Sequence, residues 1–321
     1  WKGVINNQIK IVVGARSSLL LPFKNLGVII VDEEHDTSYK QDEGIIYHAR
    51  DMAISRASFE KIPIHLITSI PSIETFNNIQ CKKYKYFKIS KRYNNYPLPK
   101  TKIVNLNIKK IKNNLISEET EAIVKNYLKN NQQVLFFLNR RGYAPYMICK
   151  NCGYKQICQN CSMYLTFHKT KNKAVCHHCL FEKNIFRNCK DGKNCEFIMY
   201  GPGVEKVFEQ VKKIFPFNKI EIFSSDYMKK KDRVKSMFER IENNKVDILI
   251  GTQMISKGFN FPKLNCIVVI DADFSGRGYD LRTTEKNIQL YHQLSGRAGR
   301  FSSESIIIYQ TLSPEDLTLN E

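Results

Sequence analysis

The sequence predicts an α/β protein built from two parallel-sheet lobes, with a cysteine-rich insertion in the second lobe. Continuous apolar runs such as 26–31 and 134–138 have the pattern of strands buried on both faces of a parallel sheet. Strand and helix patterns alternate in both halves of the chain, which is typical of this class. Eight of the ten cysteines fall between Cys149 and Cys195, so a separate element interrupts the second half.

Length and composition indicate a folded protein with an anionic partner. The 321 residues leave room for two or three domains, and 42% hydrophobic content is ample for packed cores. The net charge of +19 favours nucleic acid as the partner, although Lys, Asn and Ile are frequent throughout, as an AT-biased genome also produces. No apolar run approaches the roughly twenty residues of a membrane helix and no secretory leader is visible, so we expect a cytoplasmic protein outside membranes. Because the chain begins with Trp1, we expect it to be a fragment.

The first lobe is predicted from residue 1 to residue 90. Residues 10–13 form a short predicted strand that leads into a small-residue turn at 14–18. The run 26–31 is the next strand, and it is followed directly by Asp32, Glu33, Glu34 and His35. Carboxylates at the carboxyl end of a parallel strand can hold Mg²⁺ and can deprotonate a water aimed at a γ-phosphate. An acidic loop is usually solvated, but the buried strand before this one favours a site.

Residues 36–57 are predicted to form a polar and aromatic loop that enters a helix. Tyr39 and Tyr47 can stack on bases, and Lys40 and Arg50 can contact phosphates. The alternative is that both tyrosines are half-buried anchors of the loop. A further strand within 64–72 ends in a hydroxyl-rich turn, and the Lys-, Tyr- and Asn-rich stretch 82–100 is predicted to connect the lobes.

Residues 91–148 are predicted to contain the linker and the start of the second lobe, 197–312 are predicted to be the remainder of that lobe, and 313–321 to be the start of a truncated carboxyl-terminal region. The strand 134–138 belongs to the start of this lobe. In its remainder, an apolar strand at 197–203 precedes a helix at about 204–214, and two more strands, 246–250 and 266–270, end in polar residues. These alternating elements predict a second parallel sheet, with residues 149–196 inserted into it.

A helix at roughly 284–294 runs into a segment that contains two arginines. Arg297 and Arg300 share one helical face, and the small residues between them allow close approach of a backbone. Such a pair can reach phosphate oxygens as arginine fingers, although a surface pair is usually only solvated.

Four cysteine pairs make up the insertion, and their spacing is typical of structural zinc sites. They are Cys149 and Cys152, Cys158 and Cys161, Cys176 and Cys179, and Cys189 and Cys195. Two such pairs complete a tetrahedral thiolate shell, so four pairs predict two closed zinc sites. A disulfide scaffold is the alternative, but it belongs to oxidising compartments.

The spacing favours one of the three ways in which the four pairs can combine. Fourteen residues separate Cys161 from Cys176, close to the usual interval of a zinc ribbon, so the two inner pairs are expected to share one metal. The outer pairs would share the other. The last pair is wider than the rest, and the nearby His168, His177 and His178 are possible substitutes for one of its members.

The motifs resemble those of superfamily 2 helicases. Residues 32–35 resemble motif II, 251–253 with 257–258 resemble motif V, and 293–300 resemble motif VI. With the eight cysteines between the two halves, the chain resembles the PriA family of bacterial primosomal replication-restart helicases over essentially its whole length. Other family-like phrases lie at 13–17, 32–41, 47–51, 138–142 and 251–262. The resemblance implies two RecA-like lobes, the first of them incomplete.

This resemblance implies an ATP-dependent 3′-to-5′ DNA helicase that acts at stalled forks to restart replication. Its cofactors would be ATP with Mg²⁺ and two Zn²⁺, and its partners would be forked and single-stranded DNA, primosome proteins and single-strand DNA-binding protein. In the family, the outer cysteine pairs share one zinc and the inner pairs share the other.

The family's site roles carry over to matching positions of this sequence. Asp32 would ligate Mg²⁺, Glu33 would be the general base, and His35 would link hydrolysis to the DNA-facing elements. Arg300, supported by Arg297 and Gln293, would stabilise the γ-phosphate. The expected DNA contacts are Arg16, Tyr39, Lys40, Arg50, Thr252 and Lys257.

The sequence also departs from the family pattern. Thr68-Ser69-Ile70 replaces the family's Ser-Ala-Thr, so the last hydroxyl is missing, and Ala15 replaces a usual threonine. No G-x-x-x-x-G-K-[ST] loop is present, and the family places this loop before the point where the chain begins. We therefore expect the isolated chain to hydrolyse ATP poorly. Two functions remain open: a helicase, or a truncated, ATPase-inactive scaffold that is stabilised by zinc and binds DNA or protein.

Overall fold

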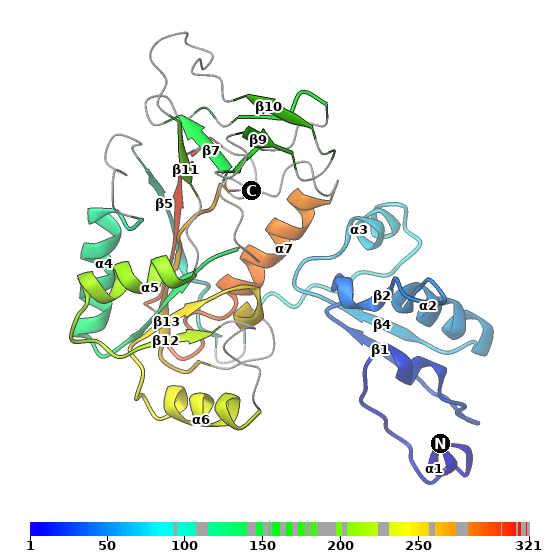
Figure 1. Cartoon of the computed structure of the whole chain (residues 1–321). Helices are drawn as coiled ribbons and strands as arrows, with labels where there is room; N and C mark the ends of the chain where they lie inside the picture. Colours follow the sequence, from blue (N-terminus) through cyan, green and yellow to red (C-terminus); the bar gives the residue numbers. More distant parts are fainter. Residues whose placement is uncertain are drawn as a thin grey trace. The chain divides into compact units, whose positions relative to one another are not determined.

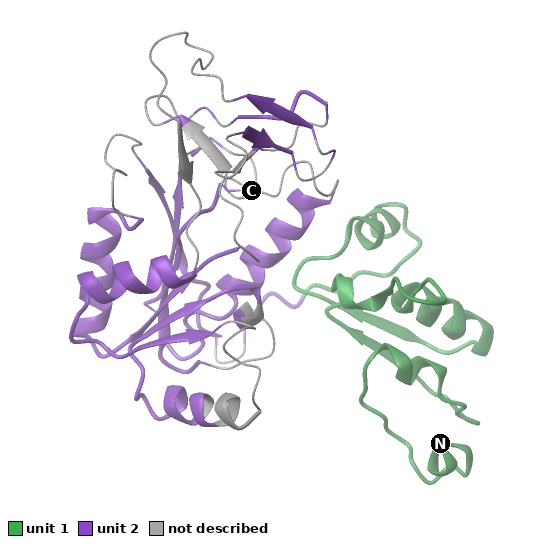
Figure 2. Cartoon of the chain, viewed as in Figure 1, with its two compact units in different colours: residues 1–88 green, residues 89–321 purple. Residues whose placement is uncertain are grey.

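The computed structural model describes residues 1–92, 95–106, 115–139, 146–149, 154, 156–160, 165–168, 173–176, 179, 181–184, 197–200, 204–223, 231–256, 261–273, 282–302, 304–312, 314–315 and 319. The chain divides into two compact units, residues 1–88 and residues 89–321 (Figure 2). Among the described residues, no helix is long and apolar enough to cross a membrane.

The first unit contains a small parallel sheet with one helix packed on it. Strand β1 (Ile29–Asp32) pairs in parallel with β4 (Ile64–Ile67), and Val31 lies opposite Leu66. A short hairpin of β2 (Lys40–Gln41) and β3 (Tyr47–His48) leads into α2 (Ala49–Glu60), which packs on both strands. The other elements are α1 (Lys2–Ile5), α3 (Ile73–Gln80) and two short 3₁₀ helices, Arg16–Leu20 and Thr37–Tyr39.

Two predictions for this unit are wrong. Residues 10–13 form no strand. The run 26–31 is not buried on both faces, because Val31 is buried whereas Ile30 is 61% exposed. Helix α2 contributes three buried alanines, 49, 53 and 57, and it covers the sheet face that carries Val31. The opposite face keeps apolar side chains exposed. The apolar run therefore predicted a strand correctly, but the prediction that both of its faces are covered is wrong.

The second unit is built on a six-stranded, fully parallel sheet with the order β12-β13-β6-β14-β15-β5. Figure 1 labels β12, β13 and β5 of this sheet. Its strands are β5 (Lys100–Asn105), β6 (Gln133–Phe137), β12 (Ile220–Phe223), β13 (Ile248–Gly251), β14 (Leu264–Val269) and β15 (Ile306–Thr311). Its helices are α4 (Glu118–Lys129), α5 (Val204–Ile214), α6 (Lys231–Glu242) and α7 (Thr283–Ser295), with a 3₁₀ turn at Gln253–Ser256. The predicted second parallel α/β lobe is therefore confirmed.

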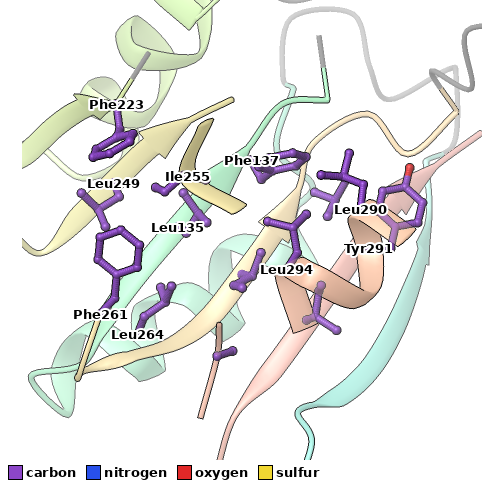
Figure 3. Packing of buried hydrophobic residues seen from close by; sticks show 14 of the residues in the cluster. Leu135, Phe137, Phe223, Leu249, Ile255, Phe261, Leu264, Leu290, Tyr291 and Leu294 are labelled. Atoms are coloured by element: carbon purple, nitrogen blue, oxygen red, sulfur yellow. The ribbon is translucent and has the colours of Figure 1, made fainter. Parts of the chain in front are cut away.

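The core of this unit lies on both faces of the sheet, which explains why its strands have continuous apolar sequences. Every residue of β6, β13 and β14 is buried. On one face, Leu135, Phe137 and Leu249 belong to a single buried cluster with Leu290 and Leu294 of α7, and Leu249 lies beside Phe223 and Phe261 (Figure 3). The other face packs Val134, Phe136 and Ile248 against α4 and α5. Each fully buried side chain of this kind contributes about 1.5–3 kcal/mol, so the central strands hold the unit together.

A separate antiparallel sheet is inserted between β6 and α5. Its order is β10-β9-β8-β7-β11, from β7 (Tyr146–Cys149), β8 (Thr166–His168), β9 (Lys173–Val175), β10 (Glu182–Asn184) and β11 (Phe197–Tyr200). Strand β11 pairs with β7 and not with the parallel sheet, so the apolar strand predicted at 197–203 belongs to the insertion. The inserted sheet thus extends beyond 149–196 at both ends.

Candidate functional site

The acidic residues 32–35 follow β1, and the backbone turns sharply there. Glu33 has a φ of +47°, which is unusual for a residue with a side chain, and its carbonyl accepts from the Asp36 N–H at 2.8 Å. The Asp32 carboxylate accepts from the Glu33 N–H at 3.0 Å. Strained backbone of this kind costs on the order of 1–3 kcal/mol and is concentrated at functional sites. The turn places the two carboxylates at the carboxyl end of a parallel strand, as predicted.

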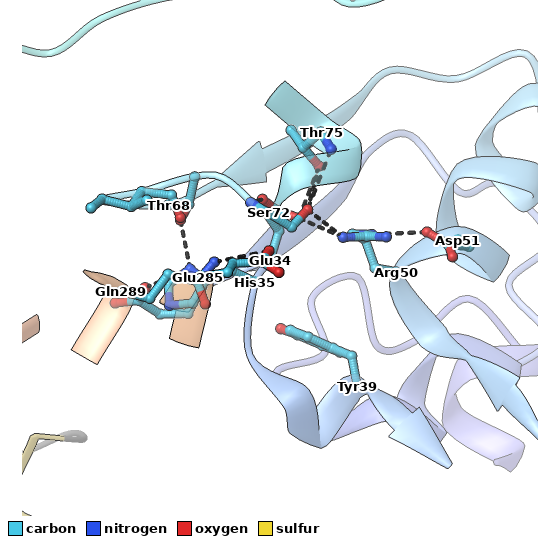
Figure 4. Close-up of polar contacts among 12 residues, drawn as sticks. Glu34, His35, Tyr39, Arg50, Asp51, Thr68, Ser72, Thr75, Glu285 and Gln289 are labelled. Carbon is cyan, nitrogen blue, oxygen red and sulfur yellow. Dashed lines mark hydrogen bonds and ion pairs between the residues drawn. The ribbon is translucent and has the colours of Figure 1, made fainter. Parts of the chain in front are cut away.

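Glu34 fixes this turn to neighbouring elements through hydrogen bonds of its side chain (Figure 4). Its side chain is fully buried and accepts from the Ser72 N–H at 2.7 Å and from the Thr75 hydroxyl at 2.9 Å. The Arg50 guanidinium lies 3.0 Å from the same carboxylate, and it also donates to the Ser72 hydroxyl at 2.6 Å. Ser72 and Thr75 belong to the N-terminal cap of α3, so Glu34 ties β1 to α3 and α2.

Arg50, one of the expected DNA contacts, has partners within the protein. Its side chain is buried, and it contacts Glu34, Ser72 and Asp51. These partners raise the pKa of the guanidinium although burial, the largest influence, acts in the opposite direction. No pattern in the sequence predicts this pairing, because Glu34 lies sixteen residues away and on another element.

His35 connects the acidic turn to the end of β4. Its Nδ1 lies 2.7 Å from the Thr68 hydroxyl, which in turn donates to the Ile70 carbonyl at 2.6 Å. Thr68 and Ile70 belong to the segment that replaces the family's Ser-Ala-Thr. The hydroxyl that contacts His35 is thus the first of this segment, and position 70 contributes its backbone.

Two predicted DNA contacts link the loop 38–40 to neighbouring segments. The Tyr39 hydroxyl donates to the Asp32 carbonyl at 2.6 Å, and Arg16 donates to the carbonyls of Ser38 at 3.2 Å and Lys40 at 2.7 Å. Burial raises the pKa of Tyr39, and the nearby carboxylates of Asp32, Asp36 and Glu33 raise it further. The Lys40 ammonium is exposed and lies 3.0 Å from Asp42.

In the second unit, an amide network joins the ends of β6 and β13 to α7. The Asn139 carboxamide donates to Asn287 at 2.9 Å and accepts from Gln253 at 3.1 Å. The predicted DNA contact Thr252 lies directly before Gln253 and is buried. Lys257, the other predicted contact in this motif, lies outside the described residues.

Arginine side chains fix the turn that carries the arginine pair by donating to its backbone carbonyls. Arg92 donates to the carbonyls of Gly296 at 3.1 Å and Ala298 at 3.2 Å, and Arg300 donates through Nε to Gly296 at 3.2 Å. Gly299 has a φ of +65°, and a Cβ there would lie 2.2 Å from the Ser305 hydroxyl, so only glycine fits. The structure places Gln293 and Arg297 on the end of α7 and directly after it.

Three predicted zinc ligands lie together in the insertion. The thiols of Cys158, Cys176 and Cys179 all lie within 4.8 Å of one another, and these residues are three of the four predicted for the inner site. Cys158 also accepts from the Asn160 N–H at 3.4 Å. A cluster of three thiolates could hold a metal ion.

Of the remaining five predicted ligands, one lies among the described residues. Cys149 is buried at the end of β7, where its N–H donates to the Tyr154 carbonyl at 2.8 Å. Cys152, Cys161, Cys189 and Cys195 lie outside the described residues.

Comparisons with known proteins agree with the helicase motifs. The helicase conserved C-terminal domain matches residues 170–302. The chain is 45% identical over 318 residues to the replication restart protein PriA of Rickettsia felis, and this match covers 98% of the chain and 49% of that protein. It is 32% identical over 321 residues to the replication restart protein PriA of Bacillus subtilis, with 99% and 40% covered. The chain thus spans half or less of the length of these relatives. Among solved structures, RecG bound to a three-way DNA junction is similar with a TM-score of 0.45 at 15% identity, covering 97% of the chain and 29% of RecG.

Proposed function

We infer, from the premise that this chain is a homologue of the replication restart proteins PriA over 98% of its length, that it contributes the motor motifs of a DNA helicase that restarts replication at stalled forks. The observation that carries the proposal is the acidic turn after β1. Its backbone is strained at Glu33, and the buried Glu34 carboxylate accepts hydrogen bonds from Ser72 and Thr75. The carboxylates of Asp32 and Glu33 are therefore held in a defined position.

The residues of this turn fit MgATP. Asp32 is exposed, and Glu33 Oε2 is a buried acceptor without a hydrogen-bond partner among the described residues, 3.6 Å from His35 Nδ1. Asp32 would hold Mg²⁺, and Glu33 would take the proton of the attacking water. When bound, MgATP supplies the phosphoryl group whose transfer drives the motor. Gln293, Arg297 and Arg300 would contact its phosphates. This sequence contains no G-x-x-x-x-G-K-[ST] loop, which is the usual cradle of the β-phosphate.

His35 and Tyr39 would report the state of this turn to DNA. Tyr39 bonds the backbone of Asp32, and Arg16 bonds the loop that carries Tyr39. A phosphate or base that moves Arg16, Tyr39 or Lys40 would therefore move the acidic turn. Thr252 and Lys257 would contact the same strand from the second unit.

Zn²⁺ is the metal that best suits the cysteine cluster. A closed set of thiolates is typical of structural zinc, and the fourth ligand of the inner site would be Cys161. The second site would be formed by Cys149, Cys152, Cys189 and Cys195. Both metals would stabilise the inserted sheet and take no part in chemistry.

A chimera tests the proposal. The residues of the Rickettsia felis relative that align with this chain would be replaced by residues 1–321, so that the remaining half of the relative supplies the region where the family resemblance places the phosphate loop. We expect DNA-stimulated ATP hydrolysis and unwinding of a fork with a 3′ single-stranded arm, and we expect Glu33→Gln to abolish both. A fork with a 5′ arm is the control for direction.

The alternative is an ATPase-inactive scaffold, and the same experiment separates it from the helicase. A folded chimera that binds forks without DNA-stimulated turnover would establish the scaffold. Unwinding of only the 5′-armed fork would refute the proposed direction while leaving the motor intact. Partners in the primosome and single-strand DNA-binding protein can be tested with the same chimera by co-purification.

A further inference from the structure

A short segment after α3 combines exposed aromatic rings with lysines. Residues 82–88, Lys-Lys-Tyr-Lys-Tyr-Phe-Lys, are called here the basic aromatic segment. They contain four lysines and three aromatic residues, and they belong entirely to the first unit. The segment takes no part in the motifs discussed above.

The start of the segment is fixed to α3. The Lys82 N–H donates to the Ile79 carbonyl at 3.0 Å, the Lys83 N–H donates to the Asn78 carbonyl at 2.9 Å, and Lys82 has a φ of +57°. This left-handed turn ends the helix and directs the chain away from it. Residues 85–88 form neither helix nor strand. The segment, also called the strap below, is therefore anchored to the first unit at its start.

The aromatic rings of the strap are presented to solvent. Phe87 is 84% exposed and Tyr86 is 61% exposed, while Tyr84 is half-buried. Two adjacent exposed rings leave a large apolar surface in contact with water. Their exposure therefore points to an external partner that covers them. A flat ring in water is a suitable platform for a base.

The charge of the chain is concentrated around this strap. Residues 75–117 contain eleven Lys and Arg and no Asp or Glu, so they carry +11 of the net +19. A bias of genome composition would spread lysines among acidic residues, as in the rest of the chain. Within the part of the chain that the structure describes, Lys82, Lys83, Lys85 and Lys88 have no ion-pair or hydrogen-bond partner for their ammonium groups.

We propose that the basic aromatic segment is a binding site for single-stranded DNA, with Tyr86 and Phe87 stacking on bases and the lysines contacting phosphates. Single strands offer both unpaired bases and closely spaced phosphates, and non-specific binders of single strands combine the same two features. Duplex DNA keeps its bases stacked internally, and acidic side chains alone give Tyr86 and Phe87 nothing to stack on. The proposal deepens the proposed function and rests on it only in that single-stranded DNA is the substrate.

The test measures binding of the 321-residue chain to a fluorescent oligo(dT) of about twenty nucleotides, without ATP, over a range of salt concentrations. Replacing both rings, Tyr86→Ala with Phe87→Ala, should weaken binding by roughly five- to hundredfold for each stacked base and should leave the salt dependence unchanged. Replacing three charges, Lys83→Gln, Lys85→Gln and Lys88→Gln, should lower the slope of log affinity against log salt by about 2.

Matched controls come from exposed residues elsewhere. The control for the rings is Phe59→Ala with Phe217→Ala, because both side chains are almost fully exposed. The control for the charges is Lys206→Gln, Lys213→Gln and Lys245→Gln, which are also exposed. Circular dichroism of all variants verifies that the fold is kept.

The outcomes separate this inference from the proposed function. If the parent chain binds oligo(dT) and the strap variants bind like their controls, the strap is not the site. If the ring variant binds normally while the charge variant loses affinity for oligo(dT), duplex DNA and poly-glutamate alike, the segment is an acidic-partner site and the inference is wrong. A parent chain that binds no DNA at low salt contradicts the inference, while the ATPase of the chimera still tests the motor.

Discussion

At the scale of single residues, the buried pair of Glu34 and Arg50 gives the clearest prediction. Arg50→Met leaves the buried Glu34 carboxylate without its cation, so the first unit should lose about 3–5 kcal/mol of unfolding free energy. Chemical denaturation measures this loss. Asp51→Asn is the control, because Asp51 is largely exposed and its contact with Arg50 contributes at most about 1 kcal/mol.

The same variants decide what Arg50 does. The double variant Glu34→Gln with Arg50→Met should lose less unfolding free energy than the two single variants lose in sum. Each single change leaves a buried charge without its partner, whereas the double variant leaves no unpaired charge. A DNA-contacting arginine would behave differently: Arg50→Met would weaken oligonucleotide binding and leave the denaturation midpoint unchanged.

Tyr39 should make the stability of the acidic turn sensitive to alkaline pH. Burial and neighbouring carboxylates raise its pKa in the folded state above the ordinary value near 10. The protonated phenol is therefore favoured by folding, so its contribution is complete below about pH 10 and is lost as the pH rises through the raised pKa. Denaturation between pH 8 and 11 should show a steeper loss for the parent than for Tyr39→Phe, and parallel curves would contradict this assignment.

At the scale of elements, the inserted sheet should depend on its metal and the parallel sheet should not. Cys176→Ser removes a ligand of the thiol cluster, and structural zinc contributes roughly 10–16 kcal/mol in small peptides. We expect the variant to lose one zinc and the amide protection of β8 to β10, with β6, β13 and β14 still protected. Zinc analysis and hydrogen exchange measure both effects, and Cys81→Ser, an exposed cysteine outside the insertion, is the control. Unchanged zinc content in Cys176→Ser would remove the inner site from the proposal.

The elements also show what the sequence could and could not predict. Strands β6 and β14 are buried on both faces, so their continuous apolar runs predicted them correctly. The run that contains β1 has the same composition, yet one face of β1 is uncovered, because the pattern does not state how many layers surround a strand. The three-thiol cluster was predictable from spacing alone, whereas the bonds of Glu34 depend on how β1, α2 and α3 meet.

At the scale of the whole molecule, the two units should differ in their ability to fold alone. Residues 89–321 contain two large clusters of buried apolar residues on either face of the six-stranded sheet. Residues 1–88 have two separate two-stranded sheets, and a sheet of two strands is marginal in water without further covering. We expect residues 89–321 expressed alone to unfold cooperatively, with a midpoint within a few degrees of the same transition in the whole chain.

Hydrogen exchange provides the comparison within the intact chain. Amides of β1 and β4 should exchange much faster than those of β13 and β14, because opening a two-stranded sheet exposes little apolar surface. Equal protection of both sheets would mean that the exposed face of β1 is covered in solution.

The two ends of the insertion, β7 and β11, form one antiparallel ribbon. Tyr146 pairs with Tyr200 at one end of this ribbon, and Cys149 pairs with Phe197 at the other. Directly paired residues of an antiparallel ribbon lie about 5 Å apart, so a short turn could join Tyr146 to Tyr200 after everything between them is deleted. The six parallel strands need none of the deleted residues for their order or register. In evolutionary terms, the inserted sheet could have been acquired or exchanged in a single step by a lobe that was already complete.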